Sequence, residues 1–320
     1  MNVPWKKWLA GAAAALSCAL AMAWPVRPVT VVVGYAAGGP ADVLARLVAQ
    51  RLTQELGQPF VVDNKPGAND NLGAAAVARA PADGYTLLFG GSNHVTNTHL
   101  YQKLPFDFTR DFIAVGMVAT FPNILVVHPA LPAASVGQLV ALARERPGRL
   151  SFASSGIGSS PHLAGELFMQ SADVKMVHVP YKGAAPAVTD LVGGNIDLMF
   201  LNAPAALALA RENKVRALGV TGEVRSRAAP ELPTVAEGGL RGYAIAPWLG
   251  FFAPAKVPAE VAQTLNRAIA RVVAQPEVAS KLQDESADPI RGDLAQLARF
   301  LAQDDAKWAK VVKDSGAKLD

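Results

Sequence analysis

The chain has 320 residues, of which 51% are hydrophobic and 18% charged, with 30 Lys and Arg against 26 Asp and Glu. This composition excludes an intrinsically disordered chain. The small net charge of +4, without a long basic run, argues against a nucleic-acid-binding protein. The single Cys18 excludes a disulfide framework and a cysteine-based metal cluster.

The first 23 residues have the pattern of a secretory signal peptide. Two lysines at positions 6 and 7 precede an uncharged run, 8–22, and Ala21-Met22-Ala23 is a small-x-small cleavage signal. The run is short for a membrane span, which needs about 20 apolar residues. We therefore expect cleavage before Trp24 and an exported, periplasmic protein, since the remaining chain has no cysteine.

The rest of the chain alternates strand-like and helical segments. Short apolar or β-branched runs predict strands over 29–33, 60–62, 85–89, 124–127, 150–153, 175–179, 196–200, 217–221 and 248–252. Apolar residues at helical spacing predict helices over 44–56, 72–80, 136–146, 161–170, 185–191 and two C-terminal segments between 261 and 308. This alternation predicts an α/β fold with mainly parallel sheets.

No segment resembles a long linker, which favours two α/β units between which the chain crosses more than once. We place the crossings near 121–127 and 247–252. The predicted first lobe is then 24–123 plus 248–320, and the second is 124–247.

Loops of small residues recur between the strands and the helices. They cover residues 36–40, 67–71, 90–93, 154–160 and 181–183. In a parallel sheet the ligand crevice lies at the carboxyl ends of the strands. Helix N-termini there present free amides and partial positive charge, which suits an anion. The sequence therefore predicts an anion-binding cleft.

Catalytic and metal-binding signals are sparse. Ser159 or Ser160 with His162 suggests an exported serine hydrolase, but serines at a helix start are better explained by N-capping. His162 and Glu166 stand four residues apart on a predicted helix, where a hydrogen-bonded pair is favoured over metal ligands because no second histidine shares the face. We expect no catalytic residue, no metal and no cofactor.

Motifs along the whole predicted mature chain resemble those of one family. They are Tyr35-x-x-Gly38-Gly39-x-x-Asp42, Asn64-Lys65-Pro66-Gly67-Ala68, Pro81-Ala82-Asp83-Gly84-Tyr85, Ser154-Ser155-Gly156-x-Gly158-Ser159-Ser160-x-His162, and His178-Val179-Pro180-Tyr181-Lys182-Gly183. Together they resemble the Bug, or TctC-like, family of periplasmic solute-binding proteins. These proteins are the receptors of tripartite tricarboxylate transport systems.

The resemblance implies a two-lobed Venus-flytrap fold that closes on a small carboxylated solute and delivers it to membrane permease subunits. A ligand-loaded partner of a sensor kinase is an alternative with the same fold and site. We expect a monomer that binds an organic acid or amino acid. The residues expected to bind the solute are Tyr35, Gly38, Gly39, Ser92, Ser155, Ser159, Tyr181 and Asn202. Asp42 is expected to cap the first helix instead.

Three departures from the family pattern leave the solute open. Asn69-Asp70 replaces a usual Gly-Gly pair, and an acid there would repel a second carboxylate or hold an ammonium or hydroxyl group. Leu201 stands where many members carry Asp, which predicts a more apolar pocket. Ala37 replaces a common proline and predicts a looser first loop. Monocarboxylates, dicarboxylates, aromatic acids and amino acids all remain candidates.

Overall fold

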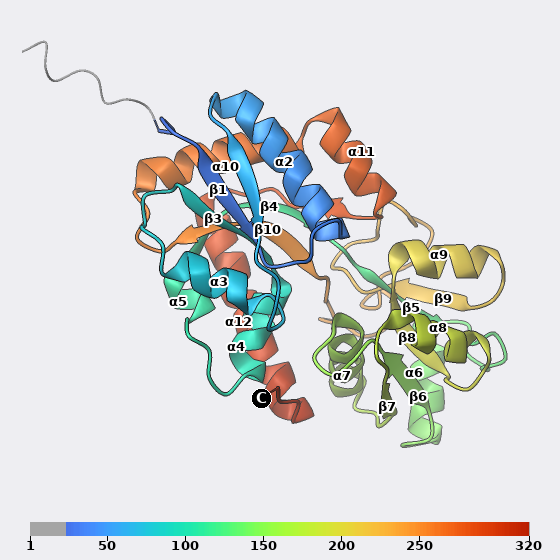
Figure 1. The fold of residues 1–320 in the computed structure, drawn as a ribbon. Coiled ribbons are helices and arrows are strands. Elements are labelled where there is room, and N and C mark those ends of the chain that lie inside the picture. The colour runs from blue at the N-terminus through green and yellow to red at the C-terminus, as the bar shows by residue number, and fades with distance from the viewer. Residues whose placement is uncertain (1–23, 320) are drawn as a thin grey trace, which may run out of the picture.

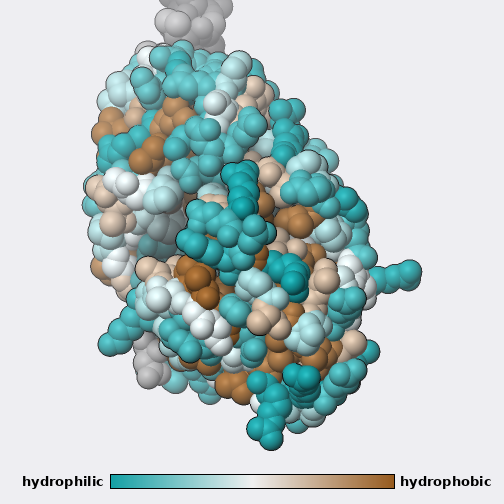
Figure 2. Space-filling view, turned by 90° about the vertical axis from the view of Figure 1, so that its right-hand side faces the viewer, coloured by the Kyte–Doolittle hydropathy of each residue, from teal (hydrophilic) through white to brown (hydrophobic). Residues whose placement is uncertain are grey.

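The computed structural model describes residues 24–319, and the predicted signal peptide lies outside this range. The described chain forms two α/β lobes, each built on one sheet (Figure 1). The two-lobed α/β fold expected from the sequence is therefore confirmed. Hydrophilic residues predominate over the face shown in Figure 2, with small hydrophobic groups between them.

The first sheet has six strands in the order β11-β4-β10-β3-β1-β2. They are β1 (Val29–Val33), β2 (Phe60–Asn64), β3 (Thr86–Gly91), β4 (Phe112–Thr120), β10 (Trp248–Pro254) and β11 (Asp288–Pro289). The helices of this lobe are α2 (Pro40–Leu56), α3 (Asn71–Ala78), α4 (Ser92–Leu100), α5 (Phe108–Asp111), α10 (Ala259–Val273), α11 (Pro276–Asp284) and α12 (Leu294–Ser315).

Helices cover both faces of the first sheet, which explains the unbroken apolar sequence of its strands. Successive residues of β1 enter opposite cores: Val31 and Val33 pack with α2 and α10, and Val32 packs with α3, α4 and α12. Strands buried on both faces lose the apolar–polar alternation of a half-exposed strand. Helix α2 ends at Gly57, whose φ of 71° is readily accessible only without a side chain.

The second sheet has five strands in the order β7-β6-β8-β5-β9. They are β5 (Asn123–Val127), β6 (Ser151–Ser154), β7 (Val177–Pro180), β8 (Leu198–Asn202) and β9 (Arg216–Val220). The helices of this lobe are α6 (Val136–Glu145), α7 (Ser160–Ala172), α8 (Ala184–Val192) and α9 (Ala203–Arg211).

Both sheets are mixed, although most of the described strands in each run in one direction, as expected: β10 and β11 run opposite to the others in the first sheet, and β5 does so in the second. In the first sheet β10 lies antiparallel between β3 and β4, and in the second β5 lies antiparallel between β8 and β9. Each of these strands enters its sheet after the chain has left the other lobe. Each of them starts at the end of the sheet where the parallel strands finish. It therefore runs in the opposite direction to those strands.

The chain passes from β4 to β5 through Phe121 and Pro122, and from β9 to β10 through residues 221–247. The carboxyl ends of the parallel strands in both sheets therefore lie beside the crossings. Helix α12 packs against α4 and also against α7 of the second lobe. Gly158 has a φ of 76°, and a Cβ there would lie 3.0 Å from the Leu100 side chain, so this glycine allows close approach of the lobes. Among residues 24–319, no helix is both long and apolar enough to span a membrane.

Candidate functional site

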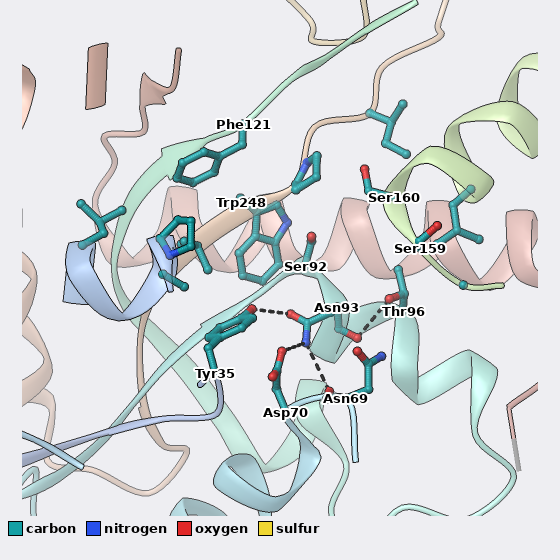
Figure 3. A pocket seen from close by; sticks show the side chains of 18 of the residues that line it. Tyr35, Asn69, Asp70, Ser92, Asn93, Thr96, Phe121, Ser159, Ser160 and Trp248 are labelled. Carbon is teal, nitrogen blue, oxygen red and sulfur yellow. Dashed lines mark hydrogen bonds between the residues drawn. The ribbon is translucent and has the colours of Figure 1, made fainter. Parts of the chain in front are cut away.

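A cavity of about 460 Å³ lies between the lobes, and residues of both line it (Figure 3). The first lobe contributes the loop after β1, the start of α2, the loop before α3 and the start of α4. The second lobe contributes the loop before α7 and its first turn, and the crossing segments complete the wall. The lining residues are Tyr35, Pro40, Ala41, Leu44, Asn69, Asp70, Ser92, Asn93, Thr96, Phe121, Gly158, Ser159, Ser160, Leu163, Ile245, Pro247, Trp248, Leu249, Lys281, Glu285 and Trp308.

The first-lobe wall is a hydrogen-bonded polar group centred on Asn93. The Tyr35 hydroxyl donates to Asn93 Oδ1 at 2.9 Å, and Asn93 Nδ2 donates to Asp70 Oδ2 at 2.6 Å (Figure 3). Burial and the nearby Asp70 raise the pKa of Tyr35 well above its usual value of 10, so the hydroxyl keeps its proton at neutral pH. The three side chains therefore hold one another in fixed positions on the cavity wall.

Helix α4 positions this group, although its sequence SNHVTNTHL has no apolar stripe. Its buried Asn97 donates through Nδ2 to Asn71 Oδ1 and to the backbone carbonyl of Asn69, each at 3.0 Å. Asn69 Nδ2 donates back to Asn97 Oδ1 at 2.7 Å. Amide hydrogen bonds to Asn69 and Asn71 thus hold α4 in addition to the hydrophobic core contacts of its buried Val95 and Leu100.

The second-lobe wall is formed at the N-terminus of α7. Ser159 Oγ donates to the Gly156 carbonyl at 2.6 Å, and Ser160 Oγ accepts from Asn123 Nδ2 at 2.8 Å. His162 Nδ1 accepts from the Gly158 amide at 3.0 Å. These contacts organise the loop and leave neither serine hydrogen-bonded to His162 within the described chain. They are the contacts of a helix start rather than of a nucleophile and its base.

Two stacked histidines contact the residues on either side of this loop. The His162 and His178 rings stack with centroids 4.0 Å apart, and His178 Nε2 lies 2.6 Å from the Oγ of fully buried Ser154. Burial and the neighbouring His162 lower the pKa of His178 to about 4, so this ring is neutral at neutral pH. His162 Nε2 lies 3.5 Å from Glu166 Oε1. Across residues 24–319, no cluster of three or more His, Cys, Asp or Glu side chains is arranged to hold a metal.

Aromatic side chains from the crossing segments form the base of the cavity. Trp248 is fully buried, and its Nε1 donates to Asp304 Oδ2 of α12 at 2.9 Å. Asp304 is 5% exposed and also pairs with Lys307 Nζ at 2.6 Å. Phe121 lies at the other crossing (Figure 3). The cavity thus combines apolar aromatic surface with a polar wall on each lobe.

Three of the predicted site residues, Tyr35, Ser92 and Ser159, line this cavity. Gly38 and Gly39 lie just outside it, in the turn between Tyr35 and α2. The Gly38 amide donates to Asp42 Oδ2 at 2.8 Å, so Asp42 holds the turn before α2 rather than capping the helix as predicted, since α2 has no side-chain cap, and Asp42 does not line the cavity.

The remaining predicted residues, Ser155, Tyr181 and Asn202, follow β6, β7 and β8 at the cleft edge but do not line this cavity. Tyr181 donates to Asp190 Oδ2 at 2.6 Å, and Asn202 Oδ1 accepts from the Ala205 amide at 3.2 Å to cap α9. Both side chains are engaged within the second lobe. Their contact with a solute stays a prediction.

Sequence reasoning missed several lining residues. Asn93 adjoins the predicted Ser92, and Phe121 and Trp248 lie at the predicted crossings, so loop position was the available signal. Leu201 is 2% exposed and packs in the second-lobe core opposite Ile124, so it does not make this cavity more apolar as expected. Asn69 and Asp70, noted only as departures from a pattern, both lie on the cavity wall.

Two α/β lobes, joined by crossing segments and enclosing a cavity where helix N-termini meet, form the two-lobed fold of periplasmic solute-binding proteins. The family is shown by sequence. The chain belongs to the TctC family, the tripartite tricarboxylate transporter family receptors, whose profile matches residues 44–317.

Individual relatives agree with this assignment. The chain is 36% identical to the protein BugT of Bordetella pertussis, over 97% of this chain and 95% of BugT. A structure from R. palustris solved with adipate is 39% identical, with a TM-score of 0.73, covering 92% of this chain and all of that one. A TctC solute-binding protein from Polaromonas, solved with no ligand, is 27% identical with a TM-score of 0.84, covering 91% and 99%.

Proposed function

We propose that this protein captures a small carboxylated solute in the cavity between its lobes and delivers it to the permease subunits of a tripartite tricarboxylate transporter. It acts in the periplasm after removal of the predicted signal peptide, and it catalyses no reaction. The observation that carries the proposal is the convergence of two helix N-termini on one cavity: α4 with Ser92, and α7 with Ser159 and Ser160.

Helix N-termini suit a carboxylate because their first amides have no partner within the helix and carry partial positive charge. The two helices belong to different lobes, so one carboxylated solute can contact both. A ligand that contacts both lobes favours the closed arrangement, because it gains contacts there that the open one lacks. The R. palustris relative solved with adipate supports an acid of this size as the kind of solute.

The structural comparisons bear on how the lobes are arranged here. The chain superposes better on the Polaromonas protein without ligand than on the adipate-bound protein, although the latter is closer in sequence. We infer that the lobes are in an open arrangement here. In that arrangement Ser155 and Tyr181, which follow β6 and β7 beside the α7 N-terminus, can approach the solute when the lobes close.

The test is a thermal-shift and calorimetric screen with adipate, succinate, glutarate, benzoate and glutamate. At 100 times the dissociation constant, a bound ligand stabilises the folded state by about 2.7 kcal/mol, so the melting temperature should rise with concentration. Ser159→Gln, which extends a side chain into the cavity, should weaken binding. Ser171→Gln, at an exposed position of the same helix, should not. A panel without heat or thermal shift would refute the proposal.

A further inference from the structure

The loop before α3 has an unusual backbone at the cavity wall. Four consecutive residues, Gly67, Ala68, Asn69 and Asp70, have φ values of 129°, 49°, 53° and 69°. Left-handed conformations favour glycine, and residues with a Cβ adopt them mainly where the surrounding structure enforces them, often at functional sites. Asn and Asp are the non-glycine residues that tolerate this region best. The loop thus keeps a glycine-like backbone while it presents two polar side chains to the cavity.

The Asp70 side chain does not cap the helix that it precedes. Asp70 occupies the N-cap position of α3, where an aspartate usually accepts from the second or third helical amide, but its side chain makes no such cap. Its Oδ2 accepts instead from Asn93, beside Tyr35 (Figure 3). Gly34 makes room for it, since a Cβ on Gly34 would lie 2.7 Å from Asp70 Cβ.

The charged residues that line the cavity include one acid more than bases. Among the lining residues, the charged ones are Asp70, Lys281 and Glu285, and Lys281 Nζ pairs with Glu285 Oε1 at 3.0 Å. Asp70 is left without a cation among the lining residues that the structure describes. A half-buried carboxylate in this position repels a carboxylate group of a solute and attracts a cation.

The neighbouring aromatic rings favour the same kind of group. Tyr35, whose side chain lines the cavity, lies next to Asp70, and Phe121 lies on the cavity wall (Figure 3). Aromatic faces attract ammonium groups more strongly when water is excluded. The side of the cavity formed by Tyr35, Asp70 and Asn93 is therefore suited to a hydrogen-bond donor with positive charge. The N-terminus of α7, on the other lobe, is suited to a carboxylate.

We propose that Asp70 binds an ammonium group of the solute, so that the protein prefers an amino acid or another amino carboxylate to a simple diacid. The inference rests on the proposed receptor function and names its class of solute. In the bound state the ammonium donates to the Asp70 carboxylate, and the solute's carboxylate accepts from the N-terminus of α7 on the other lobe. The amide of Asn93 fixes the Asp70 carboxylate for this contact.

The experiment compares solutes that differ at one end. Calorimetry at pH 7.5 measures 6-aminohexanoate against hexanoate and adipate, and glutamate against glutarate. We expect the amino compound of at least one set to bind about tenfold more tightly than its matched acids, which corresponds to about 1.4 kcal/mol. Asp70→Asn keeps the shape and the acceptor for Asn93 but removes the charge, and should abolish this preference.

Asp63→Asn is the matched control, because Asp63 is an exposed first-lobe acid that pairs with Lys65 and does not line the cavity. It should leave the preference unchanged. Tighter binding of adipate or glutarate than of the amino compounds would overturn the inference and leave the receptor function standing. An unchanged preference in Asp70→Asn would also overturn it. Failure of all five compounds to bind would refute the receptor function for such acids, and the inference with it.

Discussion

Replacing Asp70 with Asn should stabilise the folded protein above pH 6 in the absence of any solute. Burial raises the pKa of Asp70 from its ordinary value of 3.8 to about 6, and the hydrogen bond from Asn93 offsets only part of this. The folded state therefore holds a proton on this carboxyl at pH values where the unfolded chain has lost it. An asparagine does not titrate and still accepts a hydrogen bond from Asn93.

The size of the effect follows from the shift in pKa. A rise from 3.8 to about 6 corresponds to about 3 kcal/mol of destabilisation once the carboxyl is ionised in both states. Because the side chain is partly exposed, we expect solvent screening to reduce this to about 1–2 kcal/mol. The folded state binds the extra proton, so the contribution of Asp70 to stability falls as the pH rises from about 4 to 6.

Urea unfolding of both proteins at pH 4, 5, 6 and 7.5 measures this contribution. Other titrating groups cancel in the difference between the two proteins. The stability of Asp70→Asn relative to the parent should increase from pH 4 to 6 and then level off. A difference that is flat over this range, or that decreases with pH, would show that Asp70 is not held in an environment that opposes its ionisation.

Three further substitutions test how the site and the second lobe are supported. Trp248→Phe removes the buried hydrogen bond to Asp304 and should cost about 1–3 kcal/mol of unfolding free energy. Trp308→Phe should cost less, because the Trp308 Nε1 is buried without a partner among the described residues; equal losses in urea unfolding would contradict the role of this bond. Gly165→Ala places a Cβ in a clash with the Phe152 ring, 2.6 Å from Cδ2 and nearer still to Cε2, and should destabilise the second lobe by about 1–3 kcal/mol. An unchanged denaturation midpoint would show that the ring moves aside freely.

Much of the secondary structure follows from local patterns. The strand over 29–33 was predicted with the bounds that the structure shows, because its β-branched run is buried on both faces. The helix ending at Gly57 was also predicted, since apolar spacing and a left-handed terminal glycine are local signals. The nine residues of β4 were missed, although they are apolar and buried, and so was α4.

Helix α4 shows why an element at the site can escape prediction from the sequence. Its polar sequence has only two buried apolar residues, Val95 and Leu100, and it is also held by hydrogen bonds from Asn97 to Asn69 and Asn71, more than twenty positions away. Sequence periodicity records only which residues face a core. A helix docked by side-chain amides gives no periodic signal. The same loop carries Asp70, whose importance depends on its distance from Asn93.

The sequence by itself determined the α/β class, the two-lobed plan and the small-residue loops at the ends of the strands, because these depend on local propensity and on periodic burial. The tertiary structure decided which loops share a cavity. It placed Tyr35 and Ser92 on the first-lobe wall and Ser159 on the second-lobe wall. It left Asn202 outside the cavity, where it caps α9. It also decided the environment of Asp70, because its burial, and the lack of a cation beside it among residues 24–319, are properties of the packed chain. Composition registers an acid, but only its surroundings determine whether that acid repels a solute or binds it.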